Sequence, residues 1–280
     1  VERMPPGPWV YARLTDDYGP EGPAARDGSI VEVIDRAGRF CGHALYNSTS
    51  DIRLRMLSRG RRSDLDRPRQ HIQRLIAAAL RLRRRVLGLD NVTDAYRIVH
   101  AEGDDLSGLI VDKLGDALVC QYHSLGFWEL REMVGSILQE LLPGHAVLHR
   151  FARTARGAEG FPESDPGRDG DEVEPRYIHE FGVRFLVHPG ASHKTGWFCD
   201  QRDNRRAIAR FTKDARVLDL CCYTGGFTIQ EARLGEAREA IGVDLDEGPL
   251  EAARENARLN KVQGKTKFVQ EDAFGYMRDM

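Results

Sequence analysis

This 280-residue sequence lacks long apolar runs, a signal peptide and an excess of charge of either sign. No stretch approaches the roughly 18 uncharged apolar residues of a membrane-spanning helix, so no membrane association is expected. The first residues, 1–7, show no charged-then-apolar pattern and no initiator Met, which predicts that the N-terminus is cut. Lys and Arg total 41 against 43 Asp and Glu, a net charge of −2, so the average charge indicates no class of partner.

Paired cysteines are also missing. The sequence has five cysteines, with no CxxC spacing among Cys41, Cys120, Cys199, Cys221 and Cys222. An odd number without paired spacing argues against a disulfide framework and against a zinc site, so no metal is expected. Unpaired cysteines also favour a reducing compartment, the cytoplasm.

What the sequence does contain is an uneven distribution of charge. Between Arg53 and Arg85 there are twelve arginines and two aspartates, a local charge of +10. Between Thr154 and Arg176 there are seven acidic residues and three arginines among Gly and Pro. The acidic stretch has little apolar surface to bury, so it is predicted to be a long mobile loop.

The hydrophobic pattern predicts an α/β protein of three regions. The first region, to about residue 65, has short alternating runs at 29–34 and 52–57, which are typical of half-buried strands in a small barrel or sandwich. The second begins with a helix whose apolar stripe runs from Ile72 to Val86. A further helix is expected at 127–141, and strands at 108–112, 117–122 and 182–187.

The third region alternates strands with helices. Strands are predicted at 216–220, 240–244 and 267–270, with helices ending near 234 and spanning 248–260. Such alternation indicates right-handed βαβ units on a parallel sheet.

The segment from Asp219 to Thr228 carries the strongest functional signal. An acid ends the first strand of this region, and a turn with Gly225 opens a helix, so a ligand can approach the backbone and the free N–H groups of the helix start. Asp244 follows nineteen residues after Gly225, a spacing that suits a carboxylate on the two hydroxyls of an adenosine ribose. Asp272 follows the third strand, and the carboxyl ends of parallel strands meet at one edge. Asp219, Asp244 and Asp272 are therefore predicted to face one crevice.

The ligand that suits this crevice is S-adenosylmethionine (SAM). A dinucleotide site requires GxGxxG, but Cys221 and Tyr223 fill two of the glycine positions, so an NAD-dependent oxidoreductase is disfavoured. A ligand with an ammonium and a sulfonium group fits three carboxylates better. We expect Asp219 to face its amino-acid end, Asp244 its ribose and Asp272 its adenine amino group. The alternative for Asp244 is a helix N-cap or a solvated strand end.

Two motifs carry a resemblance to a known family. The runs His193-Lys-Thr-Gly-Trp-Phe-Cys-Asp-Gln-Arg-Asp-Asn-Arg205 and Asp219-Leu-Cys-Cys-Tyr-Thr-Gly-Gly-Phe227 resemble those of class I SAM-dependent rRNA methyltransferases that modify C5 of cytosine in large-subunit rRNA. The segments 8–11 and 28–46 are similar to the N-terminal PUA domain of that family, and 102–112 to the start of its central domain. The resemblance implies a PUA-like RNA-binding β barrel over 1–65, a central α/β domain over 66–188 and a Rossmann-like methyltransferase domain over 189–280.

The resemblance also implies site residues. Cofactor contacts are implied at Asp219, Tyr223, Thr224, Gly225, Asp244 and Asp272, with Lys194, Thr195, Gln201 and Arg205 beside the cleft. The family continues with an Asp-Pro-Pro motif and a nucleophilic Cys, whereas this sequence stops at Met280. We therefore expect a truncated methyltransferase domain that is inactive alone. Cys221 and Cys222 are interpreted as pocket or packing residues, so no catalytic residue is assigned.

The implied partner is rRNA, and a homodimer is compatible with the sequence. The arginine-rich stretch offers a surface for RNA phosphates, with contacts predicted at Arg53, Arg55, Arg81, Arg83, Arg84 and Arg85. The alternative for these arginines is an ordinary solvated helix face and a basic loop. Two other functions stay open: a non-catalytic RNA-binding protein, and an rRNA methyltransferase acting on another base such as guanine.

Overall fold

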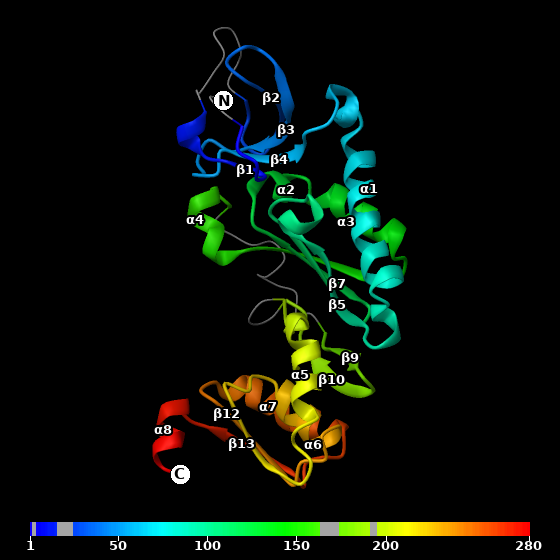
Figure 1. Ribbon diagram of the computed structural model, residues 1–280, viewed down its shortest axis with the longest axis vertical. Coiled ribbons are helices and arrows are strands. Elements are labelled where there is room, and N and C mark those ends of the chain that lie inside the picture. Colours follow the sequence, from blue (N-terminus) through cyan, green and yellow to red (C-terminus); the bar gives the residue numbers. More distant parts are fainter. Residues whose placement is uncertain (2–3, 16–24, 163–173, 191–194) are drawn as a thin grey trace. The chain divides into compact units, whose positions relative to one another are not determined.

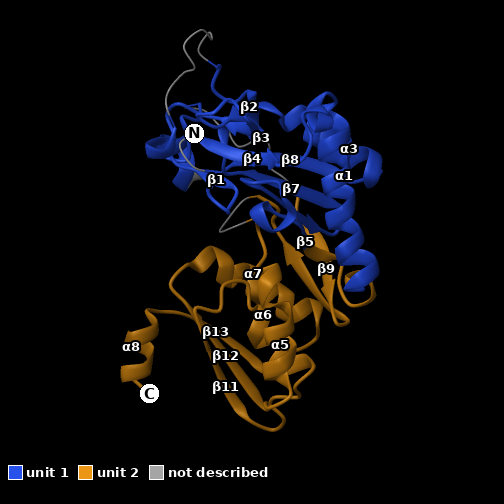
Figure 2. Ribbon diagram, turned by 45° about the horizontal axis from the view of Figure 1, so that its top comes forward, with its two compact units in different colours: residues 1–88, 97–172 blue, residues 89–96, 173–280 orange. Residues whose placement is uncertain are grey.

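The computed structural model describes residues 1, 4–15, 25–162, 174–190 and 195–280. The chain forms two compact units, one of residues 1–88 and 97–172 and one of residues 89–96 and 173–280 (Figure 2). Both units combine helices with sheets, which confirms the predicted α/β class. Residues 163–173, about half of the predicted acidic loop, lie outside the described residues.

The first unit begins with a four-stranded antiparallel sheet (Figure 1). Its strand order is β1 (Trp9–Val10), β4 (Leu54–Ser58), β3 (Phe40–Tyr46), β2 (Ile30–Ile34). The alternation seen in the sequence places one face of these strands inside, where Val10, Val33, Ala44, Tyr46, Leu54 and Met56 form a buried cluster. The 3₁₀ turns η1 (Ala12–Leu14) and η2 (Arg62–Leu65) flank the sheet.

A second four-stranded sheet lies in this unit, except for Ala95 and Tyr96 of its first strand, which belong to the second unit. It is made of β5 (Ala95–His100), β6 (Leu109–Leu114), β7 (Ala117–Tyr122) and β8 (Ala146–Phe151). The β6–β7 pair is antiparallel, and β7 and β8 are parallel because α2 (Leu125–Glu129) and α3 (Arg131–Leu141) cross between them. Strands β5 and β8 were not predicted from the sequence.

The predicted basic helix of this unit is α1 (Pro68–Arg81), which continues as the π-helix η3 (Leu82–Val86). Pro68 begins the helix because proline fits the first helical turn, whose N–H groups have no partner within the helix. Helix α1 packs against α3. The remaining short turns are η4 (Leu89–Asn91), which belongs to the second unit, and η5 (Ala101–Asp104), η6 (Arg153–Ala155) and α4 (Arg156–Glu159).

The second unit contains the predicted parallel sheet. The chain runs through the hairpin β9 (Arg176–Glu180) and β10 (Val183–Val187), then η7 (Cys199–Gln201) and α5 (Arg202–Ala209). It continues through β11 (Arg216–Leu220), α6 (Gly226–Arg233), β12 (Glu239–Asp244), α7 (Glu247–Leu259), β13 (Thr266–Gln270) and α8 (Ala273–Arg278). The strand order β11-β12-β13 follows the chain, so crossovers of one hand place α6 and α7 on the same face of the sheet (Figure 2).

Two asparagines of α7 fasten the hairpin to this layer. Asn256, which is fully buried, accepts a hydrogen bond from the Leu186 N–H (2.6 Å) and donates to the Thr224 carbonyl (3.3 Å). Asn260 accepts from the Arg184 N–H (3.0 Å). The hairpin, α7 and the turn after β11 are thereby held in one arrangement. None of the helices in the described ranges is long and apolar enough to cross a bilayer.

Candidate functional site

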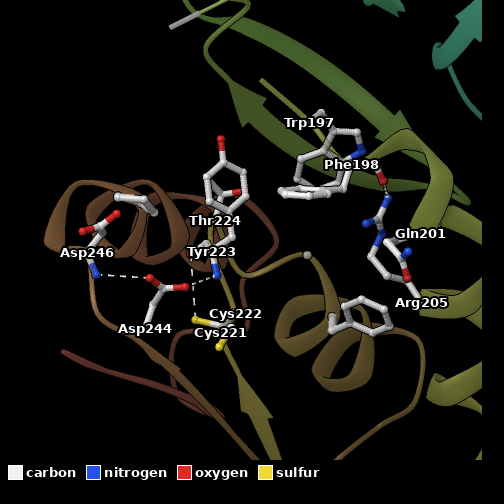
Figure 3. A pocket seen from close by; sticks show the side chains of 13 residues that line it. Trp197, Phe198, Gln201, Arg205, Cys221, Cys222, Tyr223, Thr224, Asp244 and Asp246 are labelled. Carbon is white, nitrogen blue, oxygen red and sulfur yellow. Dashed lines mark hydrogen bonds between the residues drawn. The ribbon is translucent and has the colours of Figure 1, made fainter. Parts of the chain in front are cut away.

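A cavity of about 420 Å³ opens where β11 and β12 end (Figure 3). This volume lies within the range of small-ligand sites, and the carboxyl ends of parallel strands are where such sites occur in open α/β sheets. The lining residues are Trp197, Phe198, Gln201, Arg205, Cys221, Cys222, Tyr223, Thr224, Gly226, Phe227, Asp244, Asp246 and Pro249.

The turn between β11 and α6 forms the floor of the cavity. Its backbone is left-handed at Cys221 (φ +62°), Tyr223 (φ +51°) and Gly225 (φ +77°). Two of these residues are not glycine, and such positions cost about 1–3 kcal/mol each, so surrounding contacts must hold them. The Cys222 N–H donates to the Val243 carbonyl (3.0 Å). A side chain at Gly242 would place its Cβ 2.8 Å from the Cys222 sulfur, so the close approach of turn and strand requires glycine there.

Asp244 joins this turn to the end of β12. Its Oδ2 accepts a hydrogen bond from the Tyr223 N–H (2.8 Å), and its Oδ1 accepts one from the Asp246 N–H (3.1 Å). The carboxylate lines the cavity in this fixed orientation. Each carboxylate oxygen has a second acceptor site, so Asp244 is able to accept hydroxyl groups of a ligand as well.

The structure corrects the expectation that three acids face one crevice, because only Asp244 of the three lines the cavity. Asp219 Oδ2 instead accepts from the Thr228 N–H (3.1 Å) and the Thr228 hydroxyl (2.7 Å) in the first turn of α6. Asp272, which is exposed, caps α8 by accepting from the N–H groups of Phe274 (3.1 Å) and Gly275 (2.9 Å). Carboxylates are favoured at helix starts because N–H groups there lack partners within the helix.

Burial has an electrostatic consequence for Asp219. Burial raises its pKa, hydrogen bonds from Thr228 act in the opposite direction, and the nearby charge of Asp244 raises it further. The net result is a pKa above the ordinary aspartate value. Through its hydrogen bonds with Thr228, Asp219 anchors the first turn of α6.

Thr224 presents a buried polar atom to the cavity. The residue is 6% exposed, and its Oγ1 has no hydrogen-bond partner among the described residues. A buried hydroxyl without a partner is costly, and Thr224 lines the cavity, so a ligand there is able to supply the missing hydrogen bond. Gly225 lies behind it, where a Cβ would come within 3.1 Å of Ala253 and Phe268.

A buried network holds the aromatic wall of the cavity. Glu180, which is fully buried, accepts from Arg205 Nε (2.9 Å) and Nη2 (2.6 Å), from Trp197 Nε1 (2.8 Å) and from Gln230 Nε2 (2.9 Å). The Arg205 guanidinium also lies 4.6 Å from the centre of the Trp197 ring. Arg205 thus lines the cavity with its charge neutralised by Glu180, and it positions the wall.

The other residues predicted beside the cleft differ in whether they line the cavity. Gln201 lines the cavity. Thr195 is buried and does not line it, and its carbonyl accepts from the Gly190 N–H (2.8 Å). Lys194 lies outside the described residues. Phe198 was not predicted as a site residue, although the aromatic pair Trp197-Phe198 in the 193–205 motif is a signal for it. Its ring meets the Tyr223 ring edge-on, with the ring centres 5.3 Å apart.

Two adjacent cysteines line the cavity, and of these Cys222 is buried. Burial, followed by the charges of Asp219 and Asp244, raises the pKa of Cys222 above its ordinary value, which disfavours a thiolate. Cys221 is exposed, and no described cysteine is in a disulfide. Within the described ranges no group of three or more His, Cys, Asp or Glu side chains is arranged to hold a metal ion.

The predicted RNA-binding arginines divide into two sets. Arg55 is buried and pairs with Glu159 (2.7 Å). Arg83 Nη2 donates to Asp104 Oδ2 (2.8 Å), and Arg53 donates to the Ser48 carbonyl (2.6 Å). Arg55 and Arg83 are therefore engaged by carboxylates within the first unit. The exposed members are Arg81, Arg84 and Arg85, at the end of α1 and in η3.

Comparison with known proteins agrees with this geometry. Residues 161–279 match the family model of S-adenosylmethionine-dependent methyltransferases, and residues 7–59 match a PUA-like domain. Proteins named ribosomal RNA large subunit methyltransferase I from Aeromonas salmonicida and Tolumonas auensis are 34% and 35% identical to this chain. The alignments cover 97% of this chain and 67% and 68% of those proteins, so the chain spans about two thirds of their length.

Solved structures share the fold. A protein described as a SAM-dependent methyltransferase from Streptococcus mutans has a TM-score of 0.73 at 20% identity, over 91% of this chain and 65% of that one. A second methyltransferase, in complex with SAH, has a TM-score of 0.78 at 19% identity, over 98% of this chain and 68% of the other.

Proposed function

Because the chain belongs to the ribosomal RNA large subunit methyltransferase I family, we propose that it holds SAM in the cavity of the second unit and serves methylation of C5 of a cytosine in large-subunit rRNA. One observation carries the proposal for the site. Asp244, with both oxygens fixed by backbone N–H groups, and the unpartnered hydroxyl of Thr224 line the same cavity at the ends of two parallel strands.

The residues present fit this cofactor. Asp244 provides acceptors for ribose hydroxyls, and Thr224 provides a hydroxyl for a further polar group. The aromatic and aliphatic wall of Trp197, Phe198 and Pro249 suits the apolar faces of adenine. Asp219, which the sequence predicts at the amino-acid end of SAM, instead anchors α6. Asp272 caps α8.

When bound, SAM supplies an electrophilic methyl group. The contribution of this chain is to fix the donor: the network around Glu180 locks Arg205 and Trp197, and the strained turn holds Tyr223 and Thr224. Alignment of donor and acceptor supplies much of the acceleration of a displacement reaction. Methylation of cytosine C5 also requires a thiolate, and Cys222 is a poor source of one because burial raises the pKa of its thiol.

For rRNA we propose a phosphate-binding surface at Arg81, Arg84 and Arg85, the exposed arginines of the predicted set. The PUA-like match of residues 7–59 supports an RNA-binding role for the first sheet. The free cysteines are compatible with action in the cytoplasm, where rRNA is made in bacteria.

The test has two arms. Calorimetric titration of this chain with SAH should give one binding site, and absence of binding would remove the proposed cofactor. Deletion of the gene that encodes the chain should remove one 5-methylcytidine from large-subunit rRNA, as measured by mass spectrometry of nucleosides, and complementation should restore it. Loss of a methylated guanine instead would keep the methyltransferase and overturn the assignment of cytosine.

A further inference from the structure

The second unit has another cavity beside α5, separate from the proposed SAM site. Its volume is about 510 Å³, and it is lined by the end of α5, the end of α6, η4 and the hairpin turn Phe181–Gly182. Three of its lining side chains are polar, those of Asn91, Arg206 and Arg210, and none of its lining residues is acidic. The lining therefore carries two positive charges and no negative one.

These two arginines stand one helical turn apart without a counter-ion. Arg206 and Arg210 are exposed, and within the described ranges neither side chain pairs with a carboxylate or donates a hydrogen bond to the protein. Their neighbour Arg205, by contrast, pairs with Glu180 (2.6 Å). Like charges four positions apart on a helix repel and destabilise it. An anion bound by both guanidinium groups would remove this repulsion.

The ring of Phe181 holds one of the two guanidinium groups. The centre of the ring lies 4.3 Å from the guanidinium carbon of Arg206. Stacking of this kind uses the flat face of the guanidinium, so the N–H groups at its edge still point outward as donors. A guanidinium in a fixed plane suits a two-point contact with the oxygens of a phosphate group.

Phe181 occupies a backbone position that disfavours it. It and Gly182 form the two-residue turn between β9 and β10, with φ of +50° and +80°. Such turns favour Asn-Gly or Asp-Gly, because a bulky residue with positive φ is strained. The Phe181 N–H donates to the Val92 carbonyl (2.8 Å), which fixes the turn. Strained residues of this kind gather at functional sites, so the ring is a candidate for a role beyond stability.

We infer that this cavity binds a phosphate group, with Arg206 and Arg210 as its donors and with Phe181 holding Arg206 in place. Two sources of phosphate share this chemistry, the backbone of RNA and a small phosphorylated molecule. RNA is the expected source, because contacts to backbone phosphates position a strand without reading its sequence. This part rests on the proposed function, in which the same unit holds the methyl donor.

The first test measures binding of the whole chain to a short fluorescein-labelled single-stranded RNA by anisotropy, at several salt concentrations. The double variant Arg206→Gln, Arg210→Gln should weaken binding at least fivefold and lower the slope of log affinity against log salt by about 1–2 units, because two phosphate contacts are lost. The matched control is Arg233→Gln, Arg238→Gln, which removes the same charge from exposed positions of the same unit outside the cavity. It should keep the slope of the parent.

Phe181→Asn separates the role of the ring from stability. Asparagine accepts a positive φ more readily than phenylalanine, so the urea midpoint of unfolding should stay the same or rise. Binding of the labelled RNA should nevertheless weaken at least threefold, because Arg206 loses the ring that holds it. Parent-like binding by Phe181→Asn of both the RNA and inorganic phosphate would overturn the inference.

Calorimetric titration with inorganic phosphate distinguishes the two sources. Loss of RNA affinity in the Arg206→Gln, Arg210→Gln variant identifies the RNA backbone. Binding of inorganic phosphate that this variant loses, with RNA affinity unchanged, identifies a small phosphorylated molecule. No change in either measurement, or equal losses in the two double variants, would overturn the inference. Titration of the parent with SAH tests the proposed function independently, since failure to bind SAH would remove that function and leave an arginine-dependent phosphate site standing.

Discussion

Glu180 and Arg205 form a buried two-point ion pair, with Arg205 Nε 2.9 Å from Oε2 and Nη2 2.6 Å from Oε1 of Glu180. Both residues are at most 2% exposed. Two further donors, from Trp197 and Gln230, complete the acceptor capacity of this carboxylate. The pair therefore holds Arg205 in place on the wall of the proposed SAM cavity.

Glu180→Gln should destabilise the chain by about 3–5 kcal/mol, because it leaves the buried Arg205 charge without a counter-ion. Urea unfolding followed by circular dichroism measures this. The control is Glu239→Gln, which breaks the exposed pair with Arg216 and should change stability by less than about 1 kcal/mol. Similar losses in the two variants would contradict a structural role for the buried pair.

Thr224→Val should separate affinity from stability. The hydroxyl has no partner in the described protein, so its removal should leave the unfolding free energy unchanged or higher. SAH affinity, measured by calorimetry, should fall about five- to tenfold, which corresponds to about 1–1.4 kcal/mol. Thr212→Val, whose hydroxyl donates to the Ala209 carbonyl (3.0 Å), should do the reverse and lower stability alone. Unchanged SAH affinity in Thr224→Val would remove Thr224 from the site.

Asp244→Ala should weaken SAH binding at least tenfold, since it removes both the ligand acceptor and the anchor of the Tyr223 N–H. Asp272→Ala is the informative comparison, because the structure makes it a helix cap. We expect a loss of about 1 kcal/mol in stability and an SAH affinity within twofold of the parent. A tenfold loss of affinity in Asp272→Ala would restore its sequence-based role at the adenine.

Glu231 should contribute a stabilisation that falls as the pH rises toward 7. Burial, and to a lesser degree the charge of Asp219, raises the pKa of Glu231 from 4.5 to about 7. The folded state therefore binds more protons than the unfolded state between these values. The stabilisation, at most about 3 kcal/mol, is fully present below pH 4.5 and is lost as the pH rises through the folded pKa.

Glu231→Gln should reduce the dependence of the unfolding free energy on pH between pH 5 and pH 8, as measured by denaturant titrations. Burial also raises the pKa of Asp219, which acts in the same direction. Glu236→Gln, at an exposed position, should keep the parent profile. An equal slope in the parent and Glu231→Gln would show that another group titrates.

Combined substitution of Arg81, Arg84 and Arg85 by Ala should lower rRNA affinity and its salt dependence. If each arginine meets one phosphate, the slope of log affinity against log salt should fall by about 2–3 units. SAH affinity should not change, because the cavity belongs to the other unit. Arg83→Ala is the contrast: it should lower stability through its pair with Asp104 and leave the salt slope near that of the parent. An unchanged slope in the triple variant would identify these arginines as ordinary solvated residues.

The local hydrophobic pattern was sufficient to predict much of the secondary structure of this protein. The strand of 216–220 and the hairpin strand of 117–122 have the predicted bounds, because their apolar residues are contiguous and end at turn residues. Strands β5, β8 and β9 were not predicted, because arginine and histidine interrupt their apolar runs. These segments become strands only through pairing with neighbouring strands. Glu180 lies in one of these missed strands, which is why its network was not foreseen.

The sequence by itself determined the βαβ order, the glycine turn at 225 and the place of Asp244 at a strand end, because these depend on residues close along the chain. Which charges meet was decided only by the tertiary structure. Arg55 was grouped with a basic RNA surface and Glu159 with an acidic loop, yet the two are buried together although 104 positions separate them. Burial makes such a pairing obligatory, since a lone charge inside the protein is far more costly than one in water.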